Sequence, residues 1–153
     1  MFVTISPKQA AHYSYMCIKL KQIGNRMSAA RKTLEGIANT SFDKTFAKCV
    51  YLLTSESLQC ENEIRAHLES LNCNNYEDIN TEPKKLAPAN TINGLESLCG
   101  YFEDAYLNSY KKLLKDKHLS TSIKSLMQNH LQLFKSSLTQ LQLFIDVKTA
   151  ELN

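Results

Sequence analysis

The chain has 153 residues, of which 22% are charged, and only four are glycine and three are proline. This length favours a single domain over residues 1–153, and so few turn-forming residues exclude a β-sandwich, a β-barrel or a collagen-like chain. The net charge of +3 is too small to call for a nucleic-acid partner. The composition therefore predicts an all-α protein that does not act on nucleic acid.

The cysteines and the start of the chain bear on location. The five cysteines are widely spaced and form no C-x-x-C pair, so we interpret them as reduced thiols. The first residues show no basic segment followed by an apolar core, and no stretch approaches the roughly 18 apolar residues of a membrane span. The sequence thus predicts a cytoplasmic protein without a membrane segment. The cysteines are Cys17, Cys49, Cys60, Cys73 and Cys99.

The first predicted helix covers about residues 7–39. Ser6 is a suitable N-cap, and Pro7 suits the first helical position because its missing N–H needs no partner there. Apolar residues then recur at alternating steps of four and three, which is the heptad pattern of a helix in a bundle. The predicted inward positions are Met16, Leu20, Ile23, Met27, Ala30, Leu34 and Ile37.

The second predicted helix covers about residues 41–72. Thr40 with Asp43 three residues later is a variant of the capping box, which marks a helix start. The break after the first helix is so short that the two helices must be antiparallel. The predicted inward positions of the second helix are Phe46, Val50, Leu53, Ser57, Cys60, Ile64 and Leu68.

A long connection follows at residues 73–90, with two prolines, four asparagines and no helical stripe. Its 18 residues reach about 59 Å when extended, whereas a helix of about 30 residues measures about 45 Å. The connection can therefore run back along the whole bundle. This favours parallel second and third helices, as in ferritin-like bundles, over a simple up-down-up-down order.

Two further helices are predicted, over about residues 91–116 and 120–151. Asn93 with Glu96 forms a capping-box pattern in the third, and Ser120 is the N-cap of the fourth. The predicted inward positions of the third helix are Leu95, Cys99, Phe102, Tyr106, Ser109 and Leu113. Those of the fourth are Ile123, Met127, His130, Phe134, Ser137, Leu141 and Phe144.

Ionisable side chains on or beside these stripes are the candidates for chemistry. Carboxylates and imidazoles at helical spacing can bind iron or manganese in the centre of a bundle. A two-iron centre needs Glu-x-x-His pairs, which the chain lacks, but a single ion needs fewer ligands. The candidate metal ligands are Glu63, His67, Glu103 and His130, with Glu56 as the next nearest acid.

The same residues also have a purely structural interpretation. Glutamates that flank an apolar stripe are most often solvated or paired with a basic residue of a neighbouring helix. A buried histidine is more often a hydrogen-bonded core residue than a metal ligand. Under this interpretation Tyr101, Tyr106 or Tyr110 is the hydrogen-bond partner of His130.

Two runs, residues 58–68 (LQCENEIRAHL) and 102–114 (FEDAYLNSYKKLL), resemble a family of small bacterial ferritin-like bundles. The resemblance extends from about residue 19 to residue 143 and implies a ferritin-like four-helix bundle with Glu103 in the interior. Metal-binding relatives place a glutamate inward on the first helix, where this chain has Ala30 and Arg31. The resemblance therefore implies the frame of the fold without its two-iron centre.

Two functions follow as expectations. The first is a non-catalytic cytoplasmic ferritin-like bundle that acts by self-association or by binding a protein partner, because long helices offer an unclosed edge. It requires no cofactor. The second is an iron- or manganese-dependent oxidase or iron-handling protein that uses the candidate ligands.

Overall fold

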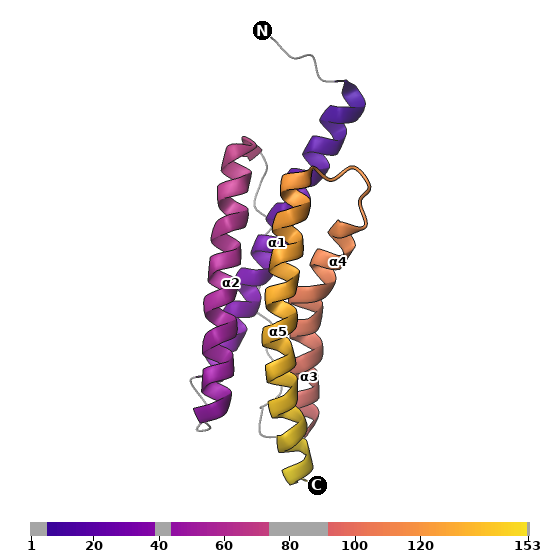
Figure 1. Ribbon diagram of the computed structural model, residues 1–153. Helices are drawn as coiled ribbons and strands as arrows, with labels where there is room; N and C mark the ends of the chain where they lie inside the picture. The colour runs from indigo at the N-terminus through magenta and orange to yellow at the C-terminus, as the bar shows by residue number, and fades with distance from the viewer. Residues whose placement is uncertain (1–5, 39–43, 74–91, 153) are drawn as a thin grey trace.

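The structure is a computed structural model that describes residues 6–38, 44–73 and 92–152 (Figure 1). All regular structure in these residues is helical and forms four rods, which confirms the predicted all-α class. Two rods are α1 (Pro7–Ala38) and α2 (Lys44–Ser70). The third consists of α3 (Ile92–Glu103), the π-helix η2 (Asp104–Asn108) and α4 (Ser109–Leu114). The fourth is α5 (Thr121–Leu152).

The starts of α1 and α5 are capped by serine, as predicted. The amide of Gln9 donates to the Ser6 hydroxyl at 3.2 Å, and the Gln9 side chain accepts from the Ser6 amide at 3.0 Å. The amide of Ile123 donates to the Ser120 hydroxyl at 3.4 Å. These bonds satisfy amides that have no partner inside the helix. The predicted capping box at Thr40 lies outside the described residues.

Contacts between α2 and α5 show that these helices are antiparallel. The hydroxyl of Ser137 donates to Glu56, and His130 pairs with Glu63 one heptad further along α2. The α2 residue number rises as the α5 residue number falls, which is the register of two helices that run in opposite directions. α1 and α2 are antiparallel for the same reason. Arg31 pairs with Glu61, and Cys17, nearer the start of α1, is bonded to Cys73, just after the end of α2.

The third rod is also antiparallel to α5. The thiol of Cys99 donates to Gln142, and the Tyr110 hydroxyl lies 3.0 Å from the His130 ring. Since α2 and the third rod both oppose α5, they run in the same direction, as Figure 1 shows. This agrees with the direction expected from a long connection, whose residues 74–91 lie outside the described part of the chain.

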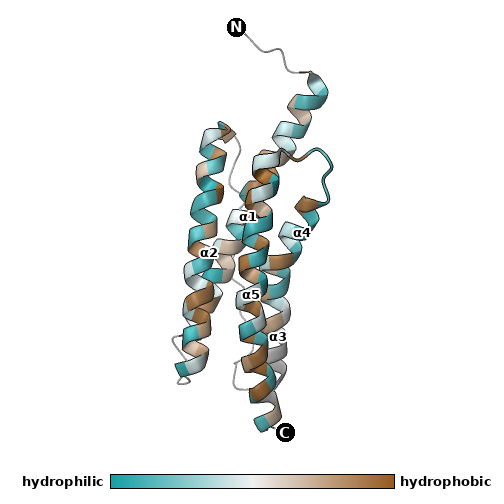
Figure 2. Cartoon of the chain, viewed as in Figure 1, coloured by the Kyte–Doolittle hydropathy of each residue, from teal (hydrophilic) through white to brown (hydrophobic). Residues whose placement is uncertain are grey.

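The core follows the predicted stripes on α1, α2 and α5. Figure 2 shows hydrophobic and hydrophilic residues interleaved along these helices, the pattern of helices with one buried face. Leu20, Leu53 and Phe134 are fully buried. Also buried at predicted positions are Met16, Ile23, Met27, Ala30, Leu34, Phe46, Val50, Ser57, Cys60, Ile64, Leu68, Ile123, Met127, His130, Ser137 and Leu141.

No helix among the described residues combines the length and apolar character needed to cross a bilayer.

The third rod departs from its predicted stripe. Cys99 is only partly buried, whereas Leu98 is 1% exposed and Tyr110 is fully buried. Leu98 lies four residues before Phe102 and Cys99 lies three, and both steps are compatible with one face of an α-helix. The prediction that Cys99 faces inward is therefore wrong. The π-helical turn η2 comes later, and after it Ser109 and Tyr110 are both buried. Phe102, Tyr106, Ser109 and Leu113 are buried as predicted.

Candidate functional site

The interior of the bundle holds one histidine, His130, with partners on two other helices. Its Nδ1 lies 3.0 Å from the hydroxyl of Tyr110, and its Nε2 contacts a carboxylate oxygen of Glu63. The sulfur of Met27 lies 3.2 Å from the same hydroxyl. The ring of His130 is 1% exposed and Tyr110 is fully buried. His130 is therefore a hydrogen-bonded residue of the core, and of the three tyrosines considered as partners it is Tyr110 that contacts the ring.

The proton positions in this cluster follow from the donor rules. An ionised carboxylate only accepts, so Nε2 of His130 carries the hydrogen that Glu63 receives. In a neutral ring Nδ1 is then an acceptor, and the Tyr110 hydroxyl donates to it. Burial lowers the pKa of His130, which favours this neutral ring, although Glu63 opposes the shift. The hydrogen bond from His130 lowers the pKa of Glu63 and keeps its carboxylate charged.

The predicted metal ligands fall in different places. Glu63 and His130 are in contact, whereas Glu103 is exposed and borders a separate cleft between α3 and α5. The half-buried His67 lies near the end of α2. Among the described residues, no group of three or more His, Cys, Asp or Glu side chains is arranged to hold a metal ion. This donor set does not fit a two-iron centre.

A second polar cluster, which the sequence did not reveal, joins α1 to α2. Glu61 is 5% exposed and accepts from Arg31 at 2.7 Å and from Arg65 at 3.0 Å. A buried carboxylate needs such partners because desolvation of an unpaired charge is costly. Among the described residues, the Nη1 of Arg31 and the hydroxyls of Ser57 and Tyr106 are buried without a hydrogen bond of good geometry.

The thiol of Cys60 is unsuited to nucleophilic chemistry. Its side chain is fully buried, and burial raises its pKa to about 12, with a further contribution from the charges of Glu63 and Glu56. Reactivity requires the thiolate, which is scarce under these conditions. Cys60 therefore acts as a small apolar residue of the core.

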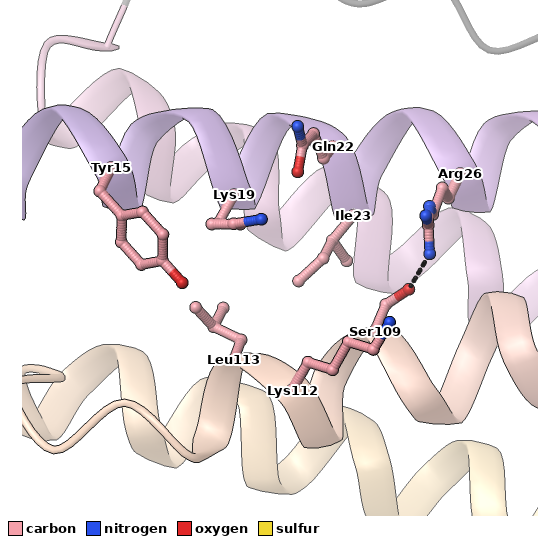
Figure 3. A pocket seen from close by; sticks show the side chains of 8 residues that line it. All are labelled: Tyr15, Lys19, Gln22, Ile23, Arg26, Ser109, Lys112 and Leu113. Atoms are coloured by element: carbon pink, nitrogen blue, oxygen red, sulfur yellow. Dashed lines mark hydrogen bonds between the residues drawn. The ribbon is translucent and has the colours of Figure 1, made fainter.

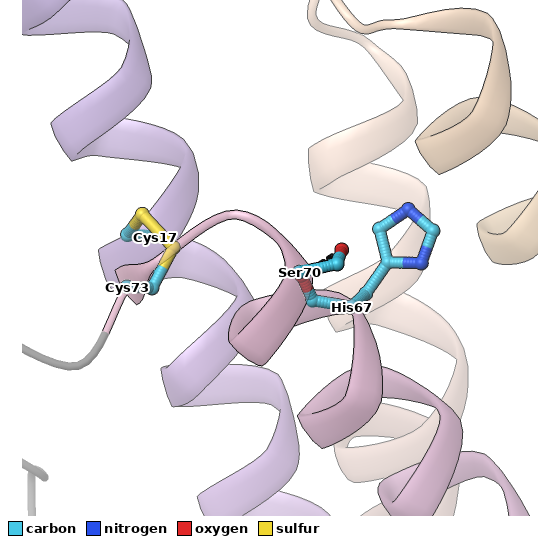
Figure 4. The surroundings of a disulfide bond; sticks show 4 residues. All are labelled: Cys17, His67, Ser70 and Cys73. Carbon is cyan, nitrogen blue, oxygen red and sulfur yellow. Dashed lines mark hydrogen bonds between the residues drawn. A yellow bond between two sulfur atoms is a disulfide. The ribbon is translucent and has the colours of Figure 1, made fainter.

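Two of the five cysteines are not reduced thiols, and the prediction for them is wrong. Cys17 on α1 and Cys73, just after α2, form a disulfide with a Cα separation of 5.6 Å (Figure 4). Asn72, with φ of 56°, makes the left-handed turn that ends α2. His67 points away from the disulfide (Figure 4). The 56-residue separation leaves no local sequence signal for this pair.

A basic cleft of about 280 Å³ lies between α1 and α4 (Figure 3). Lys19, Arg26 and Lys112 line it, with the buried Ile23 and Leu113 beneath them. Arg26 donates to the hydroxyl of Ser109 across the cleft at 3.1 Å. This site was not predicted from the sequence, although Tyr15, Lys19, Gln22 and Arg26 recur at steps of four, three and four and so share one face of α1.

Comparison of the chain with family models, with curated proteins and with solved structures finds no match in any of the three.

Proposed function

We propose that the chain is a non-catalytic ferritin-like helical bundle that acts by self-association or by contact with a protein partner. The parallel α2 and third rod support the ferritin-like frame. The observation that carries the non-catalytic role is the closed contact of His130 with Tyr110 and Glu63. Its ring is 1% exposed, so a substrate has no access to it.

Apolar side chains left outside the core support a role for the surface. Tyr51 is 76% exposed on α2, and Leu143 and Val147 are 61% and 57% exposed on α5. Burial of such side chains in an interface stabilises a complex by roughly 25 cal/mol for each Å² removed from water. We take a second copy of the chain as the first partner to test, because paired bundles are common.

Light scattering across a range of protein concentrations tests this function. We expect a mass of more than one chain, and we expect Leu143→Lys to shift the protein toward a single chain. Gln140→Lys is the matched control, since it adds the same charge at an exposed position of the same helix. A mass of one chain at every concentration would contradict self-association.

A single iron or manganese ion is the second candidate function, and the contact between Glu63 and His130 is the observation that favours it. Elemental analysis after reconstitution with ferrous iron tests it. We expect Glu63→Gln to remove bound metal and Glu103→Gln to leave it in place, because Glu103 borders a different cleft. Protein that retains no metal after reconstitution would exclude this function.

The cytoplasmic location stays a prediction, and the Cys17–Cys73 disulfide weighs against it. Disulfides persist mainly in oxidising compartments, because cytosolic reductants keep most thiols reduced. Location can be read from the redox state of these cysteines in cells, by alkylation under conditions that stop thiol exchange. A reduced pair would support the cytoplasm.

A further inference from the structure

The basic cleft between α1 and α4 brings three cationic side chains to one small space. Lys19 and Arg26 come from α1, and Lys112 comes from α4 on the opposite wall (Figure 3). None of the eight residues that line the cleft is acidic. Like charges gathered in this way repel one another, and an anion between them removes the repulsion.

Neighbouring groups hold two of these cations in place. The Ser109 hydroxyl accepts from Arg26 at 3.1 Å, and Ser109 is itself 8% exposed. The ammonium of Lys19 lies 5.5 Å from the centre of the Tyr15 ring, within the range of a cation–π contact. Such contacts reduce the side-chain entropy that would be lost when a ligand binds.

The lining and the size of the cleft restrict the ligand further. Tyr15 is 43% exposed and offers its ring to a ligand, whereas Ile23 and Leu113 are only 4% and 3% exposed. A volume of about 280 Å³ is close to the lower end of small-molecule sites. A phosphate dianion offers more charge and more acceptor oxygens to three cations than a carboxylate does.

We propose that this cleft is a binding site for a small phosphate monoester, with the phosphate held by Lys19, Arg26 and Lys112 and an apolar body against the ring of Tyr15. The site does not depend on self-association of the chain. Arg26 supplies planar paired donors, which suit phosphate oxygens, while the lysines add charge. The ester's apolar group replaces water over the exposed part of the Tyr15 ring.

Calorimetric titration of the full chain with phenyl phosphate tests the proposal, with phenol at equal concentration and equal ionic strength as the uncharged probe. We expect saturable binding of phenyl phosphate and none of phenol. Lys19→Gln and Lys112→Gln should each weaken the binding about tenfold, the usual effect of losing one charged hydrogen bond.

Lys111→Gln is the matched control, because it removes the same charge from the same helix at an exposed position outside the cleft. We expect it to change the affinity by less than about twofold. Thermal unfolding would show that each variant still folds. Absence of saturable binding, or an equal loss of affinity in Lys111→Gln and Lys112→Gln, would overturn the proposal.

Discussion

The hydroxyl of Tyr110 lies 3.0 Å from Nδ1 of His130, and both side chains are enclosed by the bundle. Tyr110→Phe removes the donor and leaves a buried nitrogen without its partner. We expect the free energy of unfolding to fall by about 1–3 kcal/mol. Urea denaturation followed by circular dichroism measures this change.

Tyr106→Phe is the matched comparison, because Tyr106 is also fully buried in the third rod. Its hydroxyl has no hydrogen bond of good geometry to the described residues, and burial raises its pKa. Its removal should therefore cost far less than the removal of the Tyr110 hydroxyl. Equal losses of stability in the two variants would show that the Tyr110–His130 bond contributes nothing specific.

Acid should destabilise the protein through the Glu63–His130 pair. Burial lowers the pKa of His130 below 6.5, so the unfolded chain binds a proton more readily as the pH falls below that value. The pKa of Glu63 is below 4.5 because His130 donates to it, so its contribution is lost only at lower pH. Both shifts act in the same direction, and we expect stability to fall as the pH is lowered from neutrality.

Urea unfolding at several pH values checks this expectation. The contribution of burial to His130 outweighs that of Glu63, because Glu63 is 42% exposed and water screens its charge. His130→Gln should remove the decline that begins near pH 6.5 and should weaken the decline at lower pH, because the hydrogen bond that lowers the pKa of Glu63 comes from His130. A stability that stays constant or rises as the pH falls from about 7 to 5 would contradict the expected sign.

The Cys17–Cys73 disulfide closes a loop of 56 residues. The chain-entropy model assigns about 4 kcal/mol of stability to a loop of this length. The double variant Cys17→Ser, Cys73→Ser should therefore unfold at a markedly lower urea concentration. Cys99→Ser serves as control, because Cys99 is a free, partly exposed thiol. A protein whose stability does not respond to reducing agent would contradict this prediction.

The three cysteines outside the disulfide should differ in their rates of alkylation. Cys60 is fully buried and burial raises its pKa to about 12, whereas Cys49 and Cys99 are partly exposed. With iodoacetamide, we expect Cys60 to be modified last in the native protein, because both access and thiolate are scarce. Peptide mass spectrometry at timed intervals measures the three rates, and unfolding in urea should make them similar. Rapid native labelling of Cys60 would contradict its position in the core.

The positions of the buried stripes on α1, α2 and α5 could be predicted because their heptad spacing is uninterrupted. Leu20, Ile64 and Met127 each lie where that spacing places them. In the third rod the same spacing predicted that Cys99 lies in the core, but Leu98 is buried there instead. Cys99 and Leu98 lie three and four residues before Phe102, and local periodicity does not decide between two adjacent apolar residues when both steps suit one helical face.

Contacts between distant segments were harder to predict. Glu63 and His130 were both candidates, and they meet because α2 and α5 are antiparallel neighbours. Glu103 was grouped with them, but a helix position alone does not decide which neighbour a flanking residue faces. Lys112 was visible only as part of a basic stretch, and its place opposite Lys19 depends on the packing of α4 against α1.

The π-helical turn also sets the rotation of the rest of the third rod. If the residues Asp104–Asn108 wound as a regular α-helix with none removed, everything after them would rotate by about 100°. Ser109 would then turn from Arg26, and Tyr110 from His130. One under-wound turn thus separates a third rod that contacts two neighbours from one that aligns with neither.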